Sequence, residues 1–421
     1  MHVTVYMLML VFMLILAGLT LFLLQRQKLL KNVQTWVISA VLLVGALLLR
    51  LHFFDAETTD FWWFLDPWVQ HYRDNGGFLG LAIPIGNYNF AYHYFLALLS
   101  YIPLPTLHLI KLLSTLFDLI LAYYVMLIVG LHAKSDTRKL IAFFLVLFLP
   151  TVFLNSAYWA QCDSIYVSFS VMGFYYAMRN RPAASMVCAA VAVAFKLQAV
   201  FLFPIYFIFL WHKKIRIRHL LVFPATYLAL ILPTTLLGRP FLETLLFYFD
   251  NALSASLGFL SLNAPSIFAL LENPWSVNES LARIGIISAF GLVLLVYLIV
   301  LLRHRNTRLP QEDYLNIALI FALGVPLFLP HMHDRFFYMA DIFAVILGLS
   351  RLRFAAAIPI TQFASLLGYH AYLRHFADPP LILPFEPLPT SLGAIALIVL
   401  LVCLMVHLTL RRPREAEVTA I

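Results

Sequence analysis

Long apolar runs separated by short polar turns dominate the chain. The first two runs cover 3–24 and 35–54, and each is close to the roughly 20 apolar residues that a helix needs to cross a bilayer. A later run, 183–211, lies between two basic clusters and is interrupted at Lys196-Leu197-Gln198, so we expect it to turn back there as two short helices. The pattern predicts an all-α, polytopic transmembrane helix bundle of about 12 to 13 helical segments.

The apolar run 90–102 can be placed in two ways. If 90–102 and 107–129 both cross the membrane, the basic segment 134–139 lies on the side opposite to the other basic turns. Because basic residues concentrate in cytoplasmic turns, we expect 90–102 to be a half-helix that does not cross, with a full crossing as the alternative.

Composition excludes a soluble globular protein of this length. Of the 421 residues, 63% are hydrophobic and 11% are charged, whereas soluble domains have roughly 45–50% apolar and about 25% charged residues. We therefore treat 1–421 as a single integral membrane domain. The first run has no basic region before it and no small-residue cleavage site, which predicts a first membrane helix instead of a cleaved signal.

The net charge of +8 has its origin in short basic turns between the apolar runs, so we expect no nucleic-acid partner. We place these turns on the cytoplasmic side, and the intervening polar segments on the outer side. The basic turns are 25–31, 132–139, 179–181, 212–218, 303–308, 351–353 and 411–414. The outer segments are a first loop of about 55–89, then 155–164, a second large loop of about 238–280, 330–335 and 372–389.

The first outer loop combines acids with aromatic residues. Its sequence FWWFLDPWVQHYRDNGG is typical of a helix lying in the membrane interface. Asp60 and Asp66 beside Trp68 and Tyr88 also suit a sugar, because carboxylates accept hydrogen bonds from hydroxyl groups and aromatic faces stack on pyranose rings. The alternative is an interfacial aromatic belt with solvated acids.

The next outer segment, 155–164, places several polar side chains between two spans, although Asp163 or Ser164 also suits the N-cap of the following helix. Lys196 and Gln198 interrupt an apolar segment. A lysine there needs an anion or a polar cavity, unless its side chain snorkels to the interface.

The segment 330–335 ends in His331-Met332-His333-Asp334-Arg335. The guanidinium of Arg335 suits a phosphate group, and His333 can donate a further hydrogen bond. His331 and His333 are weak candidates for metal ligands, because no matching Cys/His pair accompanies them.

Lys111 and Asp118 are spaced so that they share one face of a helix. We interpret them as a structural polar pair or as cavity lining, and not as catalysts.

These motifs, in this order, resemble the GT-C superfamily of membrane glycosyltransferases. The resemblance is greatest to the bacterial family related to the transferase that adds the second mannose in GPI anchor synthesis, and more distant to dolichyl-phosphate-glucose-dependent glucosyltransferases. The chain departs from the family pattern at three positions, Phe90 for Pro, Ala160 for Gly and Asp334 for Glu. The matching residues are Asp60 with Trp68, Asn87-Tyr88, Lys111 with Asp118, Asn155 to Ser164, Lys196 with Gln198, and Met332 to Arg335.

The resemblance implies an inverting hexosyltransferase that moves mannose or glucose from a polyprenyl- or dolichyl-phosphate to a hydroxyl on a lipid- or glycan-linked acceptor. The implied general base is Asp60, with Asp66 in reserve. Arg335, His333 and Lys196 would bind the donor phosphate. The sugar and acceptor pocket would include Trp68, Tyr88, Trp159, Gln161, Asp163, Gln198 and Asp334.

No cofactor is required by this chemistry, and a divalent metal is compatible with it. The compact layout favours a bacterial plasma membrane over the endoplasmic reticulum, with the active site facing outside. The alternatives are a membrane transporter or flippase, and a polymerase or ligase of lipid-linked glycans. A shared outer pocket for Asp60, Lys196 and Arg335 favours the enzyme, whereas a chain of charges through the midplane favours transport.

Overall fold

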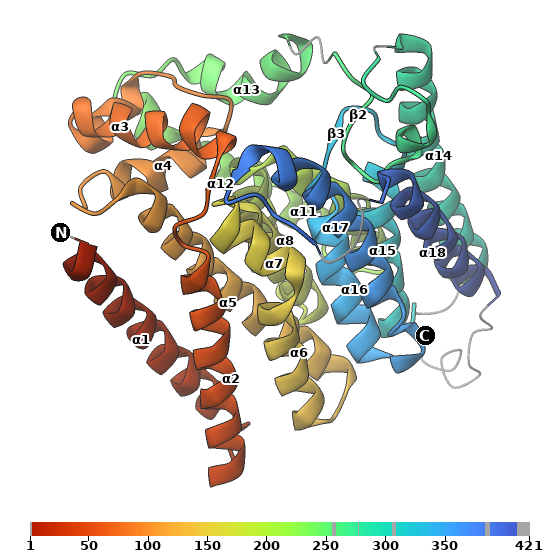
Figure 1. Cartoon of the computed structure of the whole chain (residues 1–421). Helices are drawn as coiled ribbons and strands as arrows, with labels where there is room; N and C mark the ends of the chain where they lie inside the picture. Colours follow the sequence, from red (N-terminus) through yellow and green to blue (C-terminus); the bar gives the residue numbers. More distant parts are fainter. Residues whose placement is uncertain (1, 255–257, 277, 305–308, 384–387, 411–421) are drawn as a thin grey trace.

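A computed structural model of the chain describes residues 2–254, 258–276, 278–304, 309–383 and 388–410. It is built almost entirely from helices (Figure 1). The α-helices are α1 (His2–Arg26), α2 (Val33–His52), α3 (Asp66–Asp74), α4 (Phe90–Leu99), α5 (Thr106–His132), α6 (Asp136–Phe148), α7 (Pro150–Phe153), α8 (Asp163–Met178), α9 (Pro182–Phe195), α10 (Pro204–Trp211), α11 (Ile217–Leu220), α12 (Val222–Leu236), α13 (Phe241–Ser254), α14 (Glu279–His304), α15 (Gln311–Phe328), α16 (Tyr338–Ser350), α17 (Ala357–Phe376) and α18 (Thr390–Leu410).

Short helical turns and strands complete the architecture. The π-helical turns are η1 (Phe61–Leu65) and η3 (Leu154–Tyr158), and the 3₁₀ turns are η2 (Gly77–Ala82), η4 (Leu197–Leu202), η5 (Ile267–Leu270) and η6 (Leu352–Phe354). The strands are β1 (Glu57–Thr58), β2 (Ser261–Leu262), β3 (Met332–His333) and β4 (Ala377–Asp378). Helices dominate as predicted, although they are more numerous and shorter than the apolar runs suggested.

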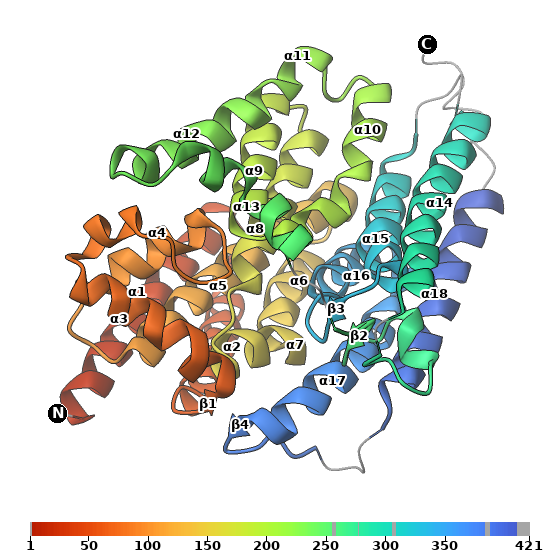
Figure 2. The same ribbon diagram turned by 90° about the horizontal axis from the view of Figure 1, so that it is seen from above.

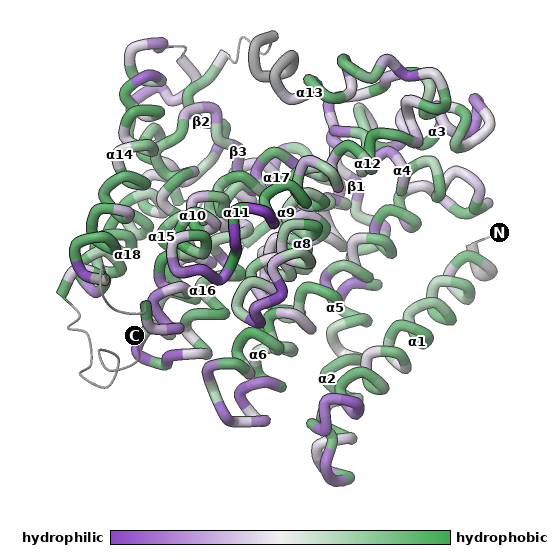
Figure 3. The backbone as a smooth tube through the Cα atoms, turned by 180° about the vertical axis from the view of Figure 1, so that it is seen from behind, coloured by the Kyte–Doolittle hydropathy of each residue, from purple (hydrophilic) through white to green (hydrophobic). Residues whose placement is uncertain are grey.

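Six helices in the described residues are long and apolar enough to cross a membrane. A seventh span results if α6 and the following segment Pro150–Tyr158, which meet at a bend of 47°, are counted together. Figure 3 shows these helices as continuous hydrophobic stretches with hydrophilic turns at their ends. The described structure is compatible with a multi-pass integral membrane protein, as the sequence predicted. The six spans are Val5–Arg26, Val33–His52, Thr106–His132, Ile217–Leu236, Glu279–Arg303 and Thr390–Leu410.

The ambiguous run 90–102 forms the ten-residue helix α4. At about 1.5 Å per residue it extends for about 15 Å, which is half of the roughly 30 Å hydrocarbon core. The half-helix expectation therefore fits the structure.

The predicted break at Lys196 is also present. Lys196 has an extended backbone (φ −148°, ψ 136°) between α9 and η4. The chain turns back after this break, because the Tyr206 hydroxyl in α10 and the Ser185 carbonyl in α9 would both lie within 3.3 Å of a Cβ placed at Gly173 in α8. The helix α10 itself packs on α15. This segment therefore forms a hairpin whose tip carries Lys196.

Contacts among the basic turns place them at one end of the bundle. Lys31 lies 2.6 Å from Asp136, and Arg351 donates to the carbonyl of His132 at the end of α5. The 13 residues of α16 separate Arg351 from the turn that contains Arg335, a distance of about 20 Å along the helix. The predicted basic residues 305–308 and 411–414 lie outside the described residues.

Two short ladders join loops that are far apart in sequence. β1 pairs antiparallel with β4, and β2 pairs parallel with β3. Figure 2 shows β1 beside β4 at one edge of the molecule and β2 beside β3 between α14 and α17. The ladders fix the first outer loop to the end of α17, and fix the second large loop to the turn that precedes Arg335.

Lys111 and Asp118 are structural, as expected, but they do not pair with each other, so that alternative of the interpretation is wrong. Asp118 instead pairs with Arg50, at 2.8 Å, and accepts a hydrogen bond from Ser156. Lys111 donates to the carbonyls of Phe53, Phe54 and Ala56 at distances from 2.5 to 3.0 Å. Spacing along one helix could not reveal that Arg50 and the three carbonyls come from the end of α2 and the residues just after it.

We predict that Asp118→Asn lowers the free energy of unfolding by about 3–5 kcal/mol, because it leaves the buried Arg50 without its carboxylate. The control Lys31→Met breaks an exposed ion pair and should cost at most about 1 kcal/mol. Thermal unfolding of both purified variants in detergent measures the difference. Equal losses for the two variants would contradict this assignment.

Candidate functional site

A cavity of about 250 Å³ lies at the end of the bundle opposite to the basic turns. Each of the five segments predicted to face outside contributes to its wall. The first loop supplies Asp60, Phe64, Leu65, Trp68, Asn87 and Tyr88, and the other four supply Gln161, Leu262, His333 to Arg335, and Tyr372. Residues separated by more than 300 positions therefore meet at one point.

Asp60 is held at the start of a π-helical turn. Thr58 belongs to β1, and its hydroxyl accepts from the backbone N–H of Phe61, the first residue of η1. The neighbouring Thr59 hydroxyl lies 2.7 Å from that of Tyr372. The ladder, the turn and this contact together direct the Asp60 carboxylate into the cavity.

Four donors surround the Asp60 carboxylate. Its Oδ2 accepts from Trp159 Nε1 at 3.0 Å and from Gln161 Nε2 at 2.8 Å. Its Oδ1 accepts from the Tyr372 hydroxyl at 2.9 Å. Arg335 Nη1 lies 3.3 Å from Oδ2. Three of these donors are neutral, so the carboxylate stays oriented even when the cation is engaged elsewhere.

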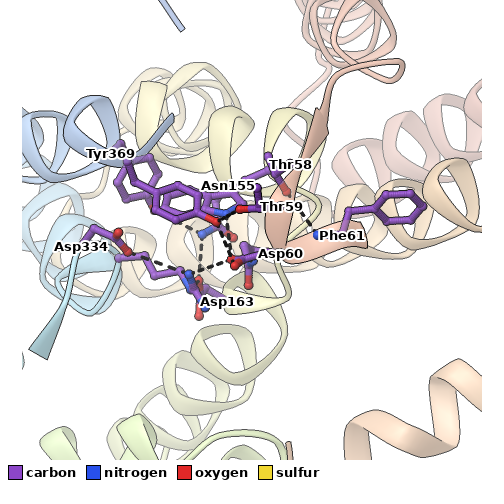
Figure 4. Close-up of polar contacts among 12 residues, drawn as sticks. Thr58, Thr59, Asp60, Phe61, Asn155, Asp163, Asp334 and Tyr369 are labelled. Carbon is purple, nitrogen blue, oxygen red and sulfur yellow. Dashed lines mark hydrogen bonds and ion pairs between the residues drawn. The ribbon is translucent and has the colours of Figure 1, made fainter. Parts of the chain in front are cut away.

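Arg335 connects the acidic groups of the site. Besides Asp60, its guanidinium lies 3.5 Å from Asp163 and 3.8 Å from Asp334. It also covers the Trp159 ring at 5.2 Å, an arrangement that suits the planar guanidinium. Figure 4 shows Asp60, Asp163 and Asp334 around this point.

Lys196 completes the charge arrangement from behind the cavity wall. Its Nζ lies 2.5 Å from Asp163 Oδ1, and Asn155 donates to Oδ2 of the same carboxylate at 2.8 Å. The lysine is 6% exposed, so its side chain is paired and does not snorkel. Asp163 is the first residue of α8, and its oxygens bind side chains instead of capping the helix.

Burial changes the protonation of two groups beside Arg335. It raises the pKa of Asp334 to about 7, an effect that the neighbouring Arg335 opposes. Burial and the positive charge of Arg335 lower the pKa of His333 to about 3. At neutral pH His333 is therefore uncharged and can donate only one hydrogen bond.

The aromatic wall depends on a glycine. Trp68 packs against Tyr88 with ring centroids 5.3 Å apart. Gly86 has φ +71°, and a Cβ there would lie 2.4 Å from the Trp68 ring. Only a residue without a side chain lets the loop pass this close to the indole.

Three candidates from the sequence lie away from the Asp60 cavity. Asp66 lines a different cavity together with Asp55 and Glu57, so the reserve acid does not join Asp60. Gln198 lies in η4 and is absent from the cavity wall. His331 Nδ1 lies 2.5 Å from the Phe259 carbonyl, which occupies one of the ring nitrogens that a metal would need.

The described residues offer a different cluster of metal-type ligands, Glu312, Asp313 and His407. It lies at the end of the bundle that carries Arg351 and Arg353, both of which pair with Glu312. His331 and His333 are not part of this cluster, and the weak metal assignment stays a prediction.

Sequence reasoning missed Tyr372 and Tyr369. Tyr372 stacks on Trp159 at 4.6 Å and donates to Asp60, while Tyr369 accepts from Asn155. Two tyrosines three residues apart share a helix face, but this spacing is equally common in ordinary membrane helices. Only the β1–β4 ladder shows why this end of α17 reaches Asp60.

Comparison with known proteins gives no assignment: no family model matches the chain, and no curated protein matches its sequence.

Ala160 carries strain between two donors of Asp60. Its φ of +58° is left-handed, a conformation that costs an L-residue about 1–2 kcal/mol. We predict that Ala160→Gly raises the free energy of unfolding by about 1 kcal/mol. The control Ala157→Gly, in the adjacent π-helical turn, should lower it by about 1 kcal/mol. Thermal unfolding compares the two, and destabilisation by both would contradict the assignment.

Asp334 should make stability depend on pH. The fold favours its neutral form, so its contribution is complete below the ordinary pKa of 3.8 and is lost as the pH rises through about 7. We predict that Asp334→Asn reduces the fall in melting temperature between about pH 4 and 7. The control Asp74→Asn, at an exposed position, should retain the wild-type fall. An unchanged profile in Asp334→Asn would rule out this group as the cause.

Proposed function

We propose that the chain is an inverting glycosyltransferase of GT-C type that transfers a hexose, mannose or glucose, from a polyprenyl- or dolichyl-phosphate to a hydroxyl acceptor. One observation carries the proposal. A carboxylate, Asp60, and a cation, Arg335, line one aromatic-walled cavity at the end of the bundle opposite to the basic turns, and a second cation, Lys196, lies behind its wall.

The reaction requires a base and a site for the leaving group. The acceptor oxygen attacks the anomeric carbon as the bond from that carbon to the phosphate oxygen breaks, and the hydroxyl proton moves to Asp60. A base within hydrogen-bond reach contributes roughly 10²–10⁴-fold. The lipid phosphate leaves as an anion, and fixed positive charge stabilises it where the charge develops.

Arg335 is the main phosphate ligand in this proposal. Its guanidinium contacts Asp60 in the structure, so a donor phosphate would compete with Asp60 for the guanidinium. Binding of the donor would thereby free Oδ2 of Asp60 for the acceptor hydroxyl. Trp159, Gln161 and Tyr372 would hold the carboxylate during this exchange. Lys196 would act through Asp163, and His333 as a neutral donor.

The cavity size favours a single sugar over an extended glycan. At about 250 Å³ it lies at or below the lower end of ordinary ligand pockets, roughly 300–1,000 Å³. A polymerase or ligase of lipid-linked glycans would need a longer cleft. Trp68, Tyr88 and Tyr372 supply the ring faces on which a pyranose stacks.

The distribution of charge favours an enzyme over a transporter. The pair of Arg50 and Asp118 is buried and lines neither the Asp60 cavity nor the cavity of Asp66. The remaining ionisable groups of the site gather at one end. By the positive-inside rule this end would face outward, in a bacterial plasma membrane.

The backbone at Ala160 supports the resemblance on which the proposal rests. The family pattern has Gly at this position, and the backbone here has the left-handed φ of +58° that glycine adopts without cost. The Gly of the family pattern is thus compatible with the backbone found at Ala160.

We predict that purified protein transfers hexose from one member of a panel of polyprenyl-phosphate hexoses, with equal rates in the presence and absence of chelator. Asp60→Asn should lower kcat by about 10²–10⁴-fold. Asp74→Asn, which changes an exposed acid of the same loop, should retain the wild-type rate. Full activity of Asp60→Asn, or loss of activity in Asp66→Asn instead, would contradict the assignment of the base.

A further inference from the structure

Arg239 is a buried arginine whose side chain has no partner in the described part of the chain. It lies in the turn between α12 and α13. The residue is 5% exposed, and its Nε is fully buried without a hydrogen-bond partner. No ion pair or hydrogen bond to a described residue involves its guanidinium. A cation in this state is costly, because it has lost water and gained nothing in return.

The backbone directs this side chain inward. Gly238 has φ +113°, a conformation that favours glycine, so the chain turns sharply just before Arg239. The backbone N–H of Arg239 donates to the Thr234 carbonyl in the last turn of α12, at 3.0 Å. Gly238 and Pro240 are exposed, whereas Arg239 between them is buried. The arginine therefore does not extend outward to water, as a snorkelling basic residue at a helix end does.

Neutral polar groups surround the guanidinium and bond elsewhere. Tyr72 of α3, and His93 and Tyr94 of α4, lie within its electrostatic range. The Tyr72 hydroxyl and the His93 ring are hydrogen-bonded to each other at 3.0 Å. Tyr94 donates to the Leu230 carbonyl of α12, and Figure 2 shows α4 beside α12. These groups satisfy one another, so they leave the N–H groups of Arg239 without an acceptor.

No acid of the described structure pairs with this cation. Glu243, in the first turn of α13, lies within electrostatic range of Arg239, but it is exposed and forms no ion pair with it. The side chain of Asp250 lies outside the described residues, and its position is more than two turns beyond Phe241, about 14 Å along α13. Arg239 therefore offers its N–H groups to an anion that is not part of the described chain.

The position of Arg239 corresponds to the depth of lipid head groups. α12 belongs to the membrane span Ile217–Leu236, whose 20 residues extend for about 30 Å, the thickness of the hydrocarbon core. Arg239 follows this span closely, at the end opposite to the basic turn 212–218. Along α12 only Ile231 and Thr234 are buried among the described side chains. Lipid chains can therefore lie along α12 with their phosphate group beside Arg239.

We propose that Arg239 binds the phosphate group of a membrane lipid whose chains lie along α12. A guanidinium suits this ligand because its planar fork of N–H groups matches two phosphate oxygens. Free inorganic phosphate shares this chemistry, and the depth of the site favours the lipid. Arg239 is not among the residues that line the Asp60 cavity. The lipid site is therefore separate from that cavity and does not rest on the proposed function.

The test is equilibrium binding of radiolabelled dioleoylphosphatidylglycerol to the purified full-length protein in a nonionic detergent. The wild type is compared with Arg239→Gln, with the control Arg283→Gln, and with Arg335→Gln, which reports on the Asp60 cavity. Arg283 is an exposed arginine near the start of α14 that pairs with Glu279. Unlabelled dioleoylglycerol, which has the same chains without the phosphate, and inorganic phosphate serve as competitors.

We expect Arg239→Gln to weaken binding about tenfold or more, because a charge-assisted contact is lost. Arg283→Gln and Arg335→Gln should leave binding unchanged, and dioleoylglycerol should not compete. Unchanged binding in Arg239→Gln, or an equal loss in the Arg283 control, would overturn the site. Loss of binding in Arg335→Gln alone would also overturn it. Inorganic phosphate that competes as strongly as unlabelled lipid would assign the site to a free anion and overturn the lipid.

The melting temperature gives an independent check. Arg239 has no described partner to lose, so without added lipid Arg239→Gln should melt no lower than the wild type. Added lipid should raise the melting temperature of the wild type more than that of the variant, because a ligand stabilises the state that binds it. A large fall in the lipid-free variant, or its failure to fold, would reveal a partner within the protein and overturn the inference.

Neither measurement depends on sugar transfer. Lipid binding that is lost in Arg239→Gln, in a protein that transfers no hexose, would overturn the proposed function and leave the lipid site standing. Hexose transfer by a protein that binds the lipid equally in all variants would do the reverse.

Discussion

The contacts of one guanidinium, that of Arg335, are the constraint on which the site depends. It lies within 3.3–3.8 Å of Asp60, Asp163 and Asp334, three carboxylates that come from three separate loops. Without this cation the acids would face one another in a largely buried space, where unpaired charge is strongly disfavoured. Arg335 holds the three acids together because it is a cation, and for the same reason it can bind a phosphate.

The rest of the fold holds the two sides of this contact in place. Lys111 binds three carbonyls at the end of α2 and so fixes the chain just before β1. The β1–β4 ladder then attaches the loop of Asp60 to the end of α17, and the β2–β3 ladder attaches the turn of His333 to the second large loop. The helices form a rigid bundle, and a few polar contacts at one end of the bundle position the side chains of the candidate site.

The sequence predicted the helical membrane architecture, the break at Lys196 and the common side of the five segments that meet at the cavity. It could do so because the length of the apolar runs and the position of the basic turns follow from the bilayer. It also named most of the cavity wall. It could not separate Asp66 from Asp60, since both occur in one loop and only the π-helical turn directs them into different cavities. Tyr372, and the partner of Asp118, depend on contacts between distant segments that no local pattern reveals.

The most direct test is an experimental structure of the protein with a polyprenyl phosphate bound, determined by electron cryomicroscopy in a lipid nanodisc. The account predicts phosphate density within hydrogen-bond distance of Arg335, with the Arg335–Asp60 contact broken and Asp60 still held by Trp159, Gln161 and Tyr372. Phosphate density away from this cavity, or an intact Arg335–Asp60 pair beside bound phosphate, would contradict it.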